Sequence, residues 1–175
     1  FRSAKATDTY TLKGGMEEVW EPRFVTHGFR YVEITGYPGI LTADKIVGRV
    51  VYDDMETIGS FETSNLLLNK IYQNAFWGIR GNYKGMPIDC PQRDERQPWL
   101  GDRATGSTGE SFIFDNRNLY TKWLKDIEQS QKEDGRLSDI APPFYMTYYS
   151  DNITWPSTYL FVANMLNKQF GDQQA

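Results

Sequence analysis

In the stretch ETSNLLLNKIYQNAFWGIRGN, residues 62–82, the spacing of apolar residues changes from one typical of strands to one typical of a helix. Thr63 or Ser64 is expected to cap a helix, since a short hydroxyl side chain can accept a hydrogen bond from the first free backbone N–H groups. The segment therefore predicts a helix and a structural boundary near residue 62. The apolar residues that follow recur at intervals of three and four, as on one stripe of a helix: Leu67, Leu68, Ile71, Tyr72, Ala75, Phe76 and Ile79.

Upstream of this boundary, residues 8–62 have the composition of strands. The segments DTYTLKG (8–14), EEVWEPRFVTHGFRYVEITGYPG (17–39) and DKIVGRVVYDD (44–54) are rich in Val, Tyr, Phe and Ile and are interrupted by Gly and Pro. Within 29–37, side chains alternate in a way that fits a strand with one better-buried face. We expect part of a β-sandwich here.

Downstream, the chain predicts further helices separated by loops. Residues 104–115 favour a helix weakened by glycines, and a firmer one begins after Asn116 and ends at the turn EDGR, residues 133–136. The stretch LSDIAPPFYMTYYSDN, 137–152, predicts a loop rich in aromatic residues. A last helix is expected to open at Thr154, with Pro156 in its first turn, and to end at Gly171.

Charge and composition narrow the class of ligand. The formal net charge is -4 and aromatic residues make up 15% of the chain. An acidic chain offers no broad basic field, so neither nucleic acid nor an anionic membrane is expected as partner, and no apolar run reaches the length of a membrane span. A lone His27 and a lone Cys90 provide no cluster of metal ligands, so we expect neither a metal nor another cofactor.

The N-terminus begins FRSAKATDTY, without an initiator Met and without the apolar core of a signal peptide. We therefore expect an internal piece of a longer protein, with any export signal elsewhere. A secreted or periplasmic location is favoured over a cytoplasmic one.

The most unusual stretch is DCPQRDERQPWLGDR, residues 89–103, which holds four carboxylates and three arginines around Trp99. Its prolines exclude a continuous helix, so these residues should form a loop between helices, and loops often carry function. Surface ion pairing alone is the alternative explanation, because most exposed charge clusters do no more than that.

Three features favour a sugar site instead. Sugar hydroxyls bind to carboxylates, while the C–H face of a sugar ring packs on an aromatic side chain such as Trp99. Acids exceed bases by one in the loop, which leaves one carboxyl group available to titrate. If the helices alternate in direction, a second loop supplies further aromatic side chains on the same side: Phe144, Tyr145, Tyr148, Tyr149 and Trp155.

DCPQRDER, followed by Trp99 and by Gly-Asp at 101–102, resembles the signature loop of family 78 glycoside hydrolases, the α-L-rhamnosidases. HGFRYVEITG (27–36) resembles the end of the β-sandwich that precedes their catalytic barrel, and SNLLLNKIYQNAFWGIRGN (64–82) resembles the first barrel helix. The resemblance implies an α+β chain, with residues 1–62 as the C-terminal part of a β-sandwich. Residues 63–175 would then be the first helices of an (α/α)6 barrel.

The resemblance also implies roles for individual residues. Glu95 matches the general acid that protonates the glycosidic oxygen. We expect Arg93 and Arg96 to orient the acids, with Asp94 as a further supporting charge. Four residues match the sugar subsite, two as carboxylates that hold rhamnose hydroxyls and two as aromatic walls: Asp89, Asp102, Trp99 and Trp155.

The family mechanism is inversion, in which a second carboxylate activates water on the opposite face of the sugar. The resemblance places that base on a barrel loop beyond Ala175, so the chain alone is expected to be inactive. It is also expected to be poorly stable, because its helices lack packing partners. Pro98 and Arg103 stand where the family commonly has Gly and Ala, which indicates an altered leaving-group side or a different sugar.

The sequence thus predicts an enzyme that releases terminal α-L-rhamnose. Two alternatives stay open: an (α/α)6 glycosidase for another sugar, and a non-catalytic carbohydrate-binding protein on the same scaffold.

Overall fold

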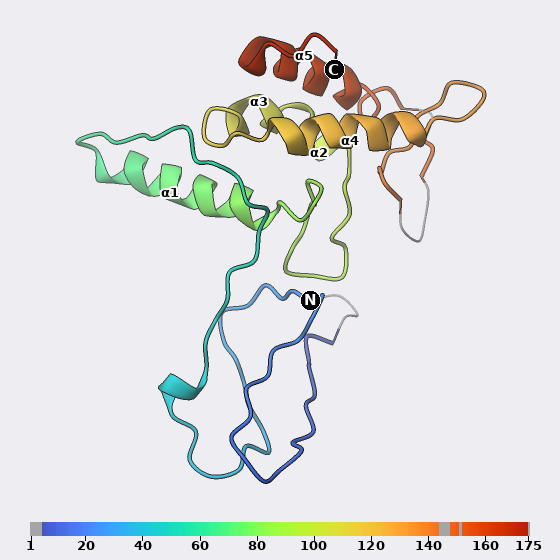
Figure 1. Ribbon diagram of the computed structural model, residues 1–175. Coiled ribbons are helices and arrows are strands. Elements are labelled where there is room, and N and C mark those ends of the chain that lie inside the picture. Colours follow the sequence, from blue (N-terminus) through green and yellow to red (C-terminus); the bar gives the residue numbers. More distant parts are fainter. Residues whose placement is uncertain (1–4, 144–147, 151, 175) are drawn as a thin grey trace.

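The computed structural model describes residues 5–143, 148–150 and 152–174 (Figure 1). Phe144 and Tyr145, which the sequence places in the aromatic loop, lie outside these residues. The helical elements of the described chain, in order, are η1 (Ala43–Lys45), α1 (Leu66–Gly81), α2 (Gly101–Ala104), α3 (Gly106–Glu110), α4 (Arg117–Gln129) and α5 (Thr158–Phe170).

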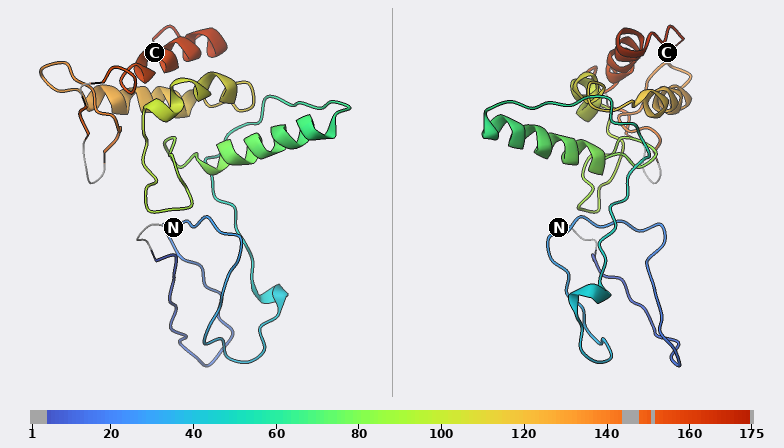
Figure 2. Two further views of the ribbon diagram at one scale, coloured as in Figure 1. Left: turned by 180° about the vertical axis from the view of Figure 1, so that it is seen from behind. Right: turned by 60° about the vertical axis from the view of Figure 1, so that its left-hand side comes forward.

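The core of the molecule lies between the C-terminal helices. Helix α5 packs against α2, α3 and α4, and the views of Figures 1 and 2 agree that α4 and α5 lie side by side. Trp123 is fully buried and donates its indole N–H to the carbonyl of Ala141 at 2.5 Å. The other members of this core are apolar as well: Leu100, Tyr120, Leu124, Ile127, Val162, Met165 and Leu166.

Helix α1 is confirmed, but its cap and its surroundings differ from expectation. The N-cap is Asn65 and not Thr63 or Ser64, since the Asn65 side chain accepts from the N–H groups of Leu67 at 2.9 Å and Leu68 at 3.4 Å. No residue of α1 is buried. The predicted apolar stripe is therefore only partly covered: the Tyr72 hydroxyl donates to the Gly59 carbonyl at 3.0 Å, and the Phe76 ring lies 5.0 Å from that of Phe114.

The remaining helices follow the prediction with shifted ends. Helix α4 starts directly after Asn116, as expected. The single helix predicted over 104–115 is instead two short helices, α2 and α3, which Thr105 separates. Helix α5 begins at Thr158, four residues later than expected, because residues 154–157 form turns; it ends at Gly171, whose φ of 69° is the predicted left-handed stop.

The strands predicted in residues 8–62 are not found: between residues 5 and 62 the structure has irregular chain, the short η1 and one isolated bridge at Thr57. Apolar side chains of this segment are open to solvent, with Val19 97% and Tyr31 89% exposed. A strand needs a neighbouring backbone and a layer that covers its apolar face, and local sequence supplies neither. The expected β-sandwich is therefore not confirmed.

Residues 5–62 nevertheless contact the helical part at defined points. The N–H of Gly85 donates to both carboxylate oxygens of Asp53 at 2.7 Å, and the N–H of Asp53 donates to the carbonyl of Tyr83 at 3.2 Å. Gly28 lies so close to Gln92 that a Cβ atom at residue 28 would approach the Gln92 Cβ to 2.5 Å. This contact places the segment around residue 28 directly against the acidic loop.

In the part of the chain that the structure describes, no helix is both long and apolar enough to cross a lipid bilayer.

Candidate active site

The acidic loop is closed at its base by Asp89 and Gln97. The Asp89 N–H donates to the Gln97 carbonyl at 3.0 Å, and the Gln97 N–H donates to Asp89 Oδ1 at 2.8 Å. Gln97 is buried, so this double contact sits at the edge of the core. Residues 90–96 therefore project as a loop whose start and end are tied together.

Glu95, the predicted general acid, is held by Arg93 inside this loop. The Arg93 Nε and Nη2 atoms both contact Glu95 Oε2, at 3.0 and 2.8 Å. The Glu95 side chain is 15% exposed, against 35% for Arg93. Both guanidinium contacts go to one oxygen, so the pair is not the fork in which each nitrogen takes a separate carboxylate oxygen.

Asp89 and Cys90 complete the surroundings of Glu95. One ligand atom from each of Asp89, Cys90 and Glu95 lies within 4.8 Å of the others. Burial and the Asp89 carboxylate raise the pKa of the Cys90 thiol, so it stays protonated and is a poor nucleophile at neutral pH. A cation here would have to displace the Arg93 guanidinium from Glu95, and the absence of a metal centre stays a prediction.

The two arginines expected to orient the acids do different things. Arg93 contacts Glu95, whereas the Nε atom of Arg96 donates to the Pro91 carbonyl at 3.2 Å. Arg96 also has a φ of 50°, in the left-handed region that few residues other than Gly adopt. Within the described residues, Arg96 thus shapes the loop backbone and makes no ion pair with a carboxylate.

A cavity of about 240 Å³ adjoins the outer side of this loop. Arg93, Asp94 and Arg96 line it together with His27 and Asp8, but Glu95 is not among the lining residues. The His27 Nε2 atom lies 2.8 Å from Asp8 Oδ2, so the one histidine of the chain pairs with a carboxylate. The cavity therefore borders the loop through Gln92, Arg93, Asp94 and Arg96, and the Glu95 side chain does not line it.

Trp99 leaves the loop and packs on the second, aromatic loop. Its ring lies 5.2 Å from that of Tyr148 and is tilted by 34°. The main chain of Trp99 pairs with Ile140 in an isolated bridge. Its indole N–H is buried and has no hydrogen-bond acceptor among the residues described. The predicted approach of the two loops is confirmed at this contact.

Trp155 packs on Gly101, the residue before Asp102, at the start of α2. The Trp155 ring packs so closely on Gly101 that a Cβ atom there would lie 2.5 Å from two ring carbons. Asn152 Oδ1 accepts from the Trp155 N–H at 3.0 Å and fixes the turn that carries the ring. Asp102 follows Gly101, is exposed, and has no ion pair or hydrogen bond through its side chain in the described part of the chain.

The predicted site residues thus form two groups. In the acidic loop, Glu95 contacts Arg93 and lies within 4.8 Å of Asp89, while at α2 Trp155 packs on Gly101, the neighbour of Asp102. Residues 97–101 join the groups, fixed by hydrogen bonds from the Leu100 N–H to the Asp139 carbonyl at 2.9 Å and from the Ala141 N–H to the Pro98 carbonyl at 3.3 Å.

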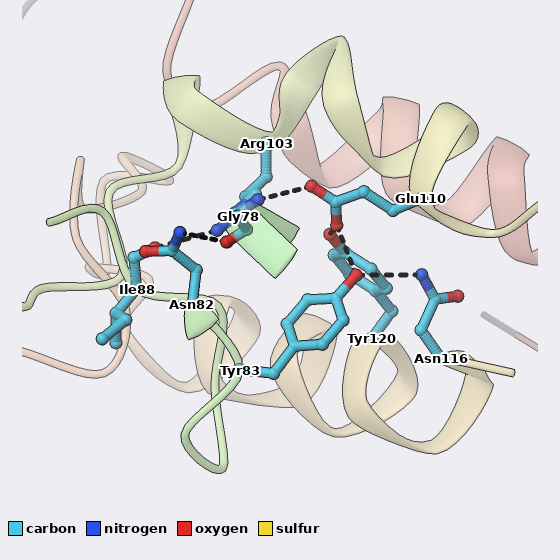
Figure 3. Close-up of polar contacts among 8 residues, drawn as sticks. All are labelled: Gly78, Asn82, Tyr83, Ile88, Arg103, Glu110, Asn116 and Tyr120. Atoms are coloured by element: carbon cyan, nitrogen blue, oxygen red, sulfur yellow. Dashed lines mark hydrogen bonds and ion pairs between the residues drawn. The ribbon is translucent and has the colours of Figure 1, made fainter. Parts of the chain in front are cut away.

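Sequence reasoning missed the buried polar residues that hold this region in place. Asp139 is buried and accepts from the Ser150 hydroxyl at 2.6 Å across the aromatic loop. Arg103 and Glu110 form a buried ion pair, shown in Figure 3. No pattern in the sequence marks these residues, because Arg103 and Glu110 stand among Gly, Ser and Thr in two short helices, and a charge alone does not reveal its partner.

The burial of Arg103 also corrects an expectation. Pro98 and Arg103, where the family commonly has Gly and Ala, predict an altered leaving-group side or a different sugar, yet the Arg103 side chain is only 10% exposed and pairs with Glu110. It cannot contact a leaving group directly from there.

Comparisons with known proteins agree on one family. The family described as bacterial alpha-L-rhamnosidase 6 hairpin glycosidase domain matches residues 56–175, and the concanavalin-like domain of bacterial alpha-L-rhamnosidase matches residues 1–52. An alpha-L-rhamnosidase of Streptomyces avermitilis is 46% identical over 141 residues, which are 81% of this chain and 14% of that protein.

Solved structures give the same result. The crystal structure of the Streptomyces avermitilis alpha-L-rhamnosidase complexed with L-rhamnose superimposes with a TM-score of 0.91 at 40% identity, over 99% of this chain and 17% of that one. The alpha-L-rhamnosidase from Dictyoglumus thermophilum gives a TM-score of 0.81 at 44% identity, over 85% and 17%. The chain thus spans about a sixth of the length of these relatives.

Proposed function

Since the chain belongs to the bacterial α-L-rhamnosidase family, we propose that it is part of a glycoside hydrolase that releases terminal α-L-rhamnose from glycosides or polysaccharides. Its partner would be a carbohydrate. The alternatives, a glycosidase for another sugar and a non-catalytic carbohydrate-binding protein, have no contact in the structure that favours them.

Glu95 is the proton donor in this proposal, and its position is the observation that carries it. The side chain is largely buried, lies beside the Asp89 carboxylate, and is oriented through one oxygen by Arg93. A general acid needs a fixed direction toward the glycosidic oxygen, and a partner that holds one oxygen supplies it. Arg93 is therefore the supporting residue that aims the acid. Arg96 holds the loop backbone through the Pro91 carbonyl, and Asp94 lines the adjoining cavity as a further supporting charge.

Asp102 is the main hydroxyl-binding carboxylate, since it is exposed at the start of α2 and its side chain has no other partner in the described residues. Trp155, beside it, and Trp99 provide the aromatic walls, on which the C–H face of the sugar packs. Asp89 contributes its second oxygen, because the first is occupied by the Gln97 N–H.

The architecture belongs to the same proposal. Residues 1–62 are the end of a β-sandwich and residues 63–175 the first helices of an (α/α)6 barrel. The reaction inverts the anomeric carbon: Glu95 protonates the leaving group while a base from the rest of the protein activates water across the ring, with about 6.5–9.5 Å between the two carboxyl groups.

The proposal is tested on the full-length protein with a panel of 4-nitrophenyl glycosides. We expect release of nitrophenol from the α-L-rhamnoside, and β-L-rhamnose as the first product in proton NMR spectra. Turnover of a different sugar alone would favour the other glycosidase, and binding of rhamnose without turnover would favour the binding protein. A first product with retained α configuration would refute inversion.

A further inference from the structure

The ion pair between Arg103 and Glu110 adjoins both ends of the segment that carries the sugar-binding carboxylates. Arg103 Nη2 donates to the carbonyl of Ile88 at 2.8 Å, and Ile88 directly precedes Asp89. Arg103 itself directly follows Asp102. Resting on the proposed function, we propose that Arg103 is a positioning residue, which fixes the directions of Asp89 and Asp102 and thereby sets the affinity for the sugar.

Glu110, the other residue of the ion pair, is held in place by several buried donors, as a positioning role for Arg103 requires. Glu110 Oε2 accepts from the hydroxyls of Tyr83 and Tyr120, each at 2.6 Å, and its Oε1 contacts Arg103 Nη1 (Figure 3). Asn116 in turn donates to the Tyr83 hydroxyl at 3.3 Å. Each carboxylate oxygen thus has at least one buried donor, and a shift of Glu110 would leave a buried polar group unpaired.

Arginine is suited to this place because its planar guanidinium serves two acceptors at once. Nη1 contacts Glu110 in α3, and Nη2 contacts Ile88, which is itself buried. Arg103, which lies in α2, thereby links Ile88, in the loop that follows α1, to Glu110 in α3. A lysine could keep the charge next to Glu110, but its single ammonium group does not reproduce the rigid, two-armed geometry.

The consequence for the site follows from chain connectivity. Asp89 is one peptide bond beyond the carbonyl that Arg103 holds, and Asp102 is one peptide bond before Arg103. Asp102 is exposed, so neighbouring side chains do not fix it, and the direction of its turn depends on the buried residue beside it. A purely stabilising ion pair would affect folding, whereas a positioning residue must also affect sugar binding.

The test uses Arg103→Lys in the full-length protein, with Arg136→Lys as the matched control. Arg136 forms an ion pair with Asp134 at 2.8 Å, and both side chains are about half exposed. For Arg103→Lys we expect a KM for 4-nitrophenyl α-L-rhamnoside and a Kd for L-rhamnose that rise about tenfold, with kcat within about threefold of the parent, since small displacements of binding groups are costly. The urea midpoint of Arg103→Lys should fall, because the buried Ile88 carbonyl loses its donor, so KM and Kd are measured without urea on protein shown to be folded. The Arg136→Lys control should change neither the midpoint nor the sugar affinity.

Parental KM and Kd values in a folded Arg103→Lys protein would overturn the positioning role. If that variant does not fold, Arg103→Met combined with Glu110→Gln removes both charges, and the same rise in KM and Kd is expected; unchanged values there overturn the role as well. A parent protein that neither cleaves the rhamnoside nor binds L-rhamnose would instead refute the proposed function.

Discussion

Asp102 and Glu95 are both carboxylic acids, but their surroundings differ. The Glu95 side chain is largely buried and contacts Arg93, whereas Asp102 is exposed and its side chain has no polar partner in the described residues. An exposed carboxylate without a partner can bind sugar hydroxyls at little cost. A buried, oriented one is better suited to transfer a proton.

The first prediction concerns Asp102. Asp102→Asn in the full-length protein should weaken L-rhamnose binding by about 10-fold or more, because a charge-assisted hydrogen bond is worth roughly twice a neutral one. Calorimetry with L-rhamnose measures the effect, and Asp134→Asn, at an exposed site elsewhere, is the control. An unchanged affinity would remove Asp102 from the subsite.

The second prediction concerns the pH dependence of Cys90 alkylation. Burial and Asp89 raise the pKa of this thiol, so its reaction with iodoacetamide should reach half-maximal rate at a pH above the value of about 8.5 for a free cysteine. Asp89→Asn removes a negative charge and should move the midpoint to lower pH. Mass spectrometry of the peptide that contains Cys90 follows the reaction, and a midpoint that rises or stays in place would contradict the inferred contact.

At this scale, the sequence proposed the site residues but could not predict their contacts. The spacing in DCPQRDER and the resemblance pointed to Glu95 and Arg93, which lie in contact. The role of Arg96 differs because its left-handed backbone directs the side chain to Pro91, and no residue pattern reveals such a φ angle. The burial of Arg103 could not be predicted, because burial is a property of the fold and not of the local sequence.

At the scale of single elements, helix α1 depends on its N-cap. Asn65→Ala removes the acceptor of the Leu67 and Leu68 N–H groups and should destabilise the first turn by about 1 kcal/mol. Hydrogen exchange of the α1 peptides, measured by mass spectrometry in the full-length protein, should therefore quicken by roughly fivefold. Asn74→Ala, an exposed site inside the same helix, should not quicken it, and equal exchange in both variants would rule out the cap.

The elements show why helix positions were predicted better than helix ends. Apolar periodicity located α1 and α4, and Gly171 marked the end of α5, since local geometry alone demands a left-handed residue there. The start of α5 moved because Thr158 donates its hydroxyl to the Leu100 carbonyl at 2.8 Å, a contact between residues far apart in sequence. The helix over 104–115 split because its glycines weaken helical order.

At the scale of the whole molecule, the strands predicted in residues 8–62 were not confirmed, because they too depend on contacts with distant parts of the chain. Residues 5–62 have strand-like composition, but hydrogen-bonded ladders need partners that composition cannot supply. Several large apolar side chains in this segment and in α1 are exposed, Phe24 and Leu66 among them. By itself the 175-residue chain should therefore bind the dye ANS strongly and show no hydrolase activity; weak dye binding would contradict this.

The free energy of unfolding at high pH should depend on the buried hydroxyls of Tyr83 and Tyr120, which donate to Glu110. Burial and Glu110 raise the pKa values of Tyr83 and Tyr120 above the usual value, so their protons are held more tightly in the folded protein. This stabilisation is complete below the unfolded-state pKa of about 10 and is lost as the pH rises toward the folded-state pKa. The urea midpoint should fall above pH 10.

Tyr83→Phe should lower the urea midpoint at pH 8, because it removes a buried donor to Glu110. Above pH 10, the midpoint of this variant should fall less steeply than that of the parent. Tyr31→Phe, at an exposed site, is the control. Parallel curves for the parent and Tyr83→Phe between pH 8 and 11 would show that the Tyr83 proton is not held by the fold.

If Glu95 donates the proton to the leaving group, its removal should matter most for rhamnosides whose leaving group cannot depart without that proton. The measurement is kcat/KM of the full-length parent and Glu95→Gln on two rhamnosides, one with an alkyl leaving group and one with 2,4-dinitrophenol. We predict a loss of about 100-fold or more on the alkyl rhamnoside and a much smaller one on the dinitrophenyl rhamnoside, whose leaving group departs without a proton. Equal, small losses on both substrates would contradict the role of Glu95.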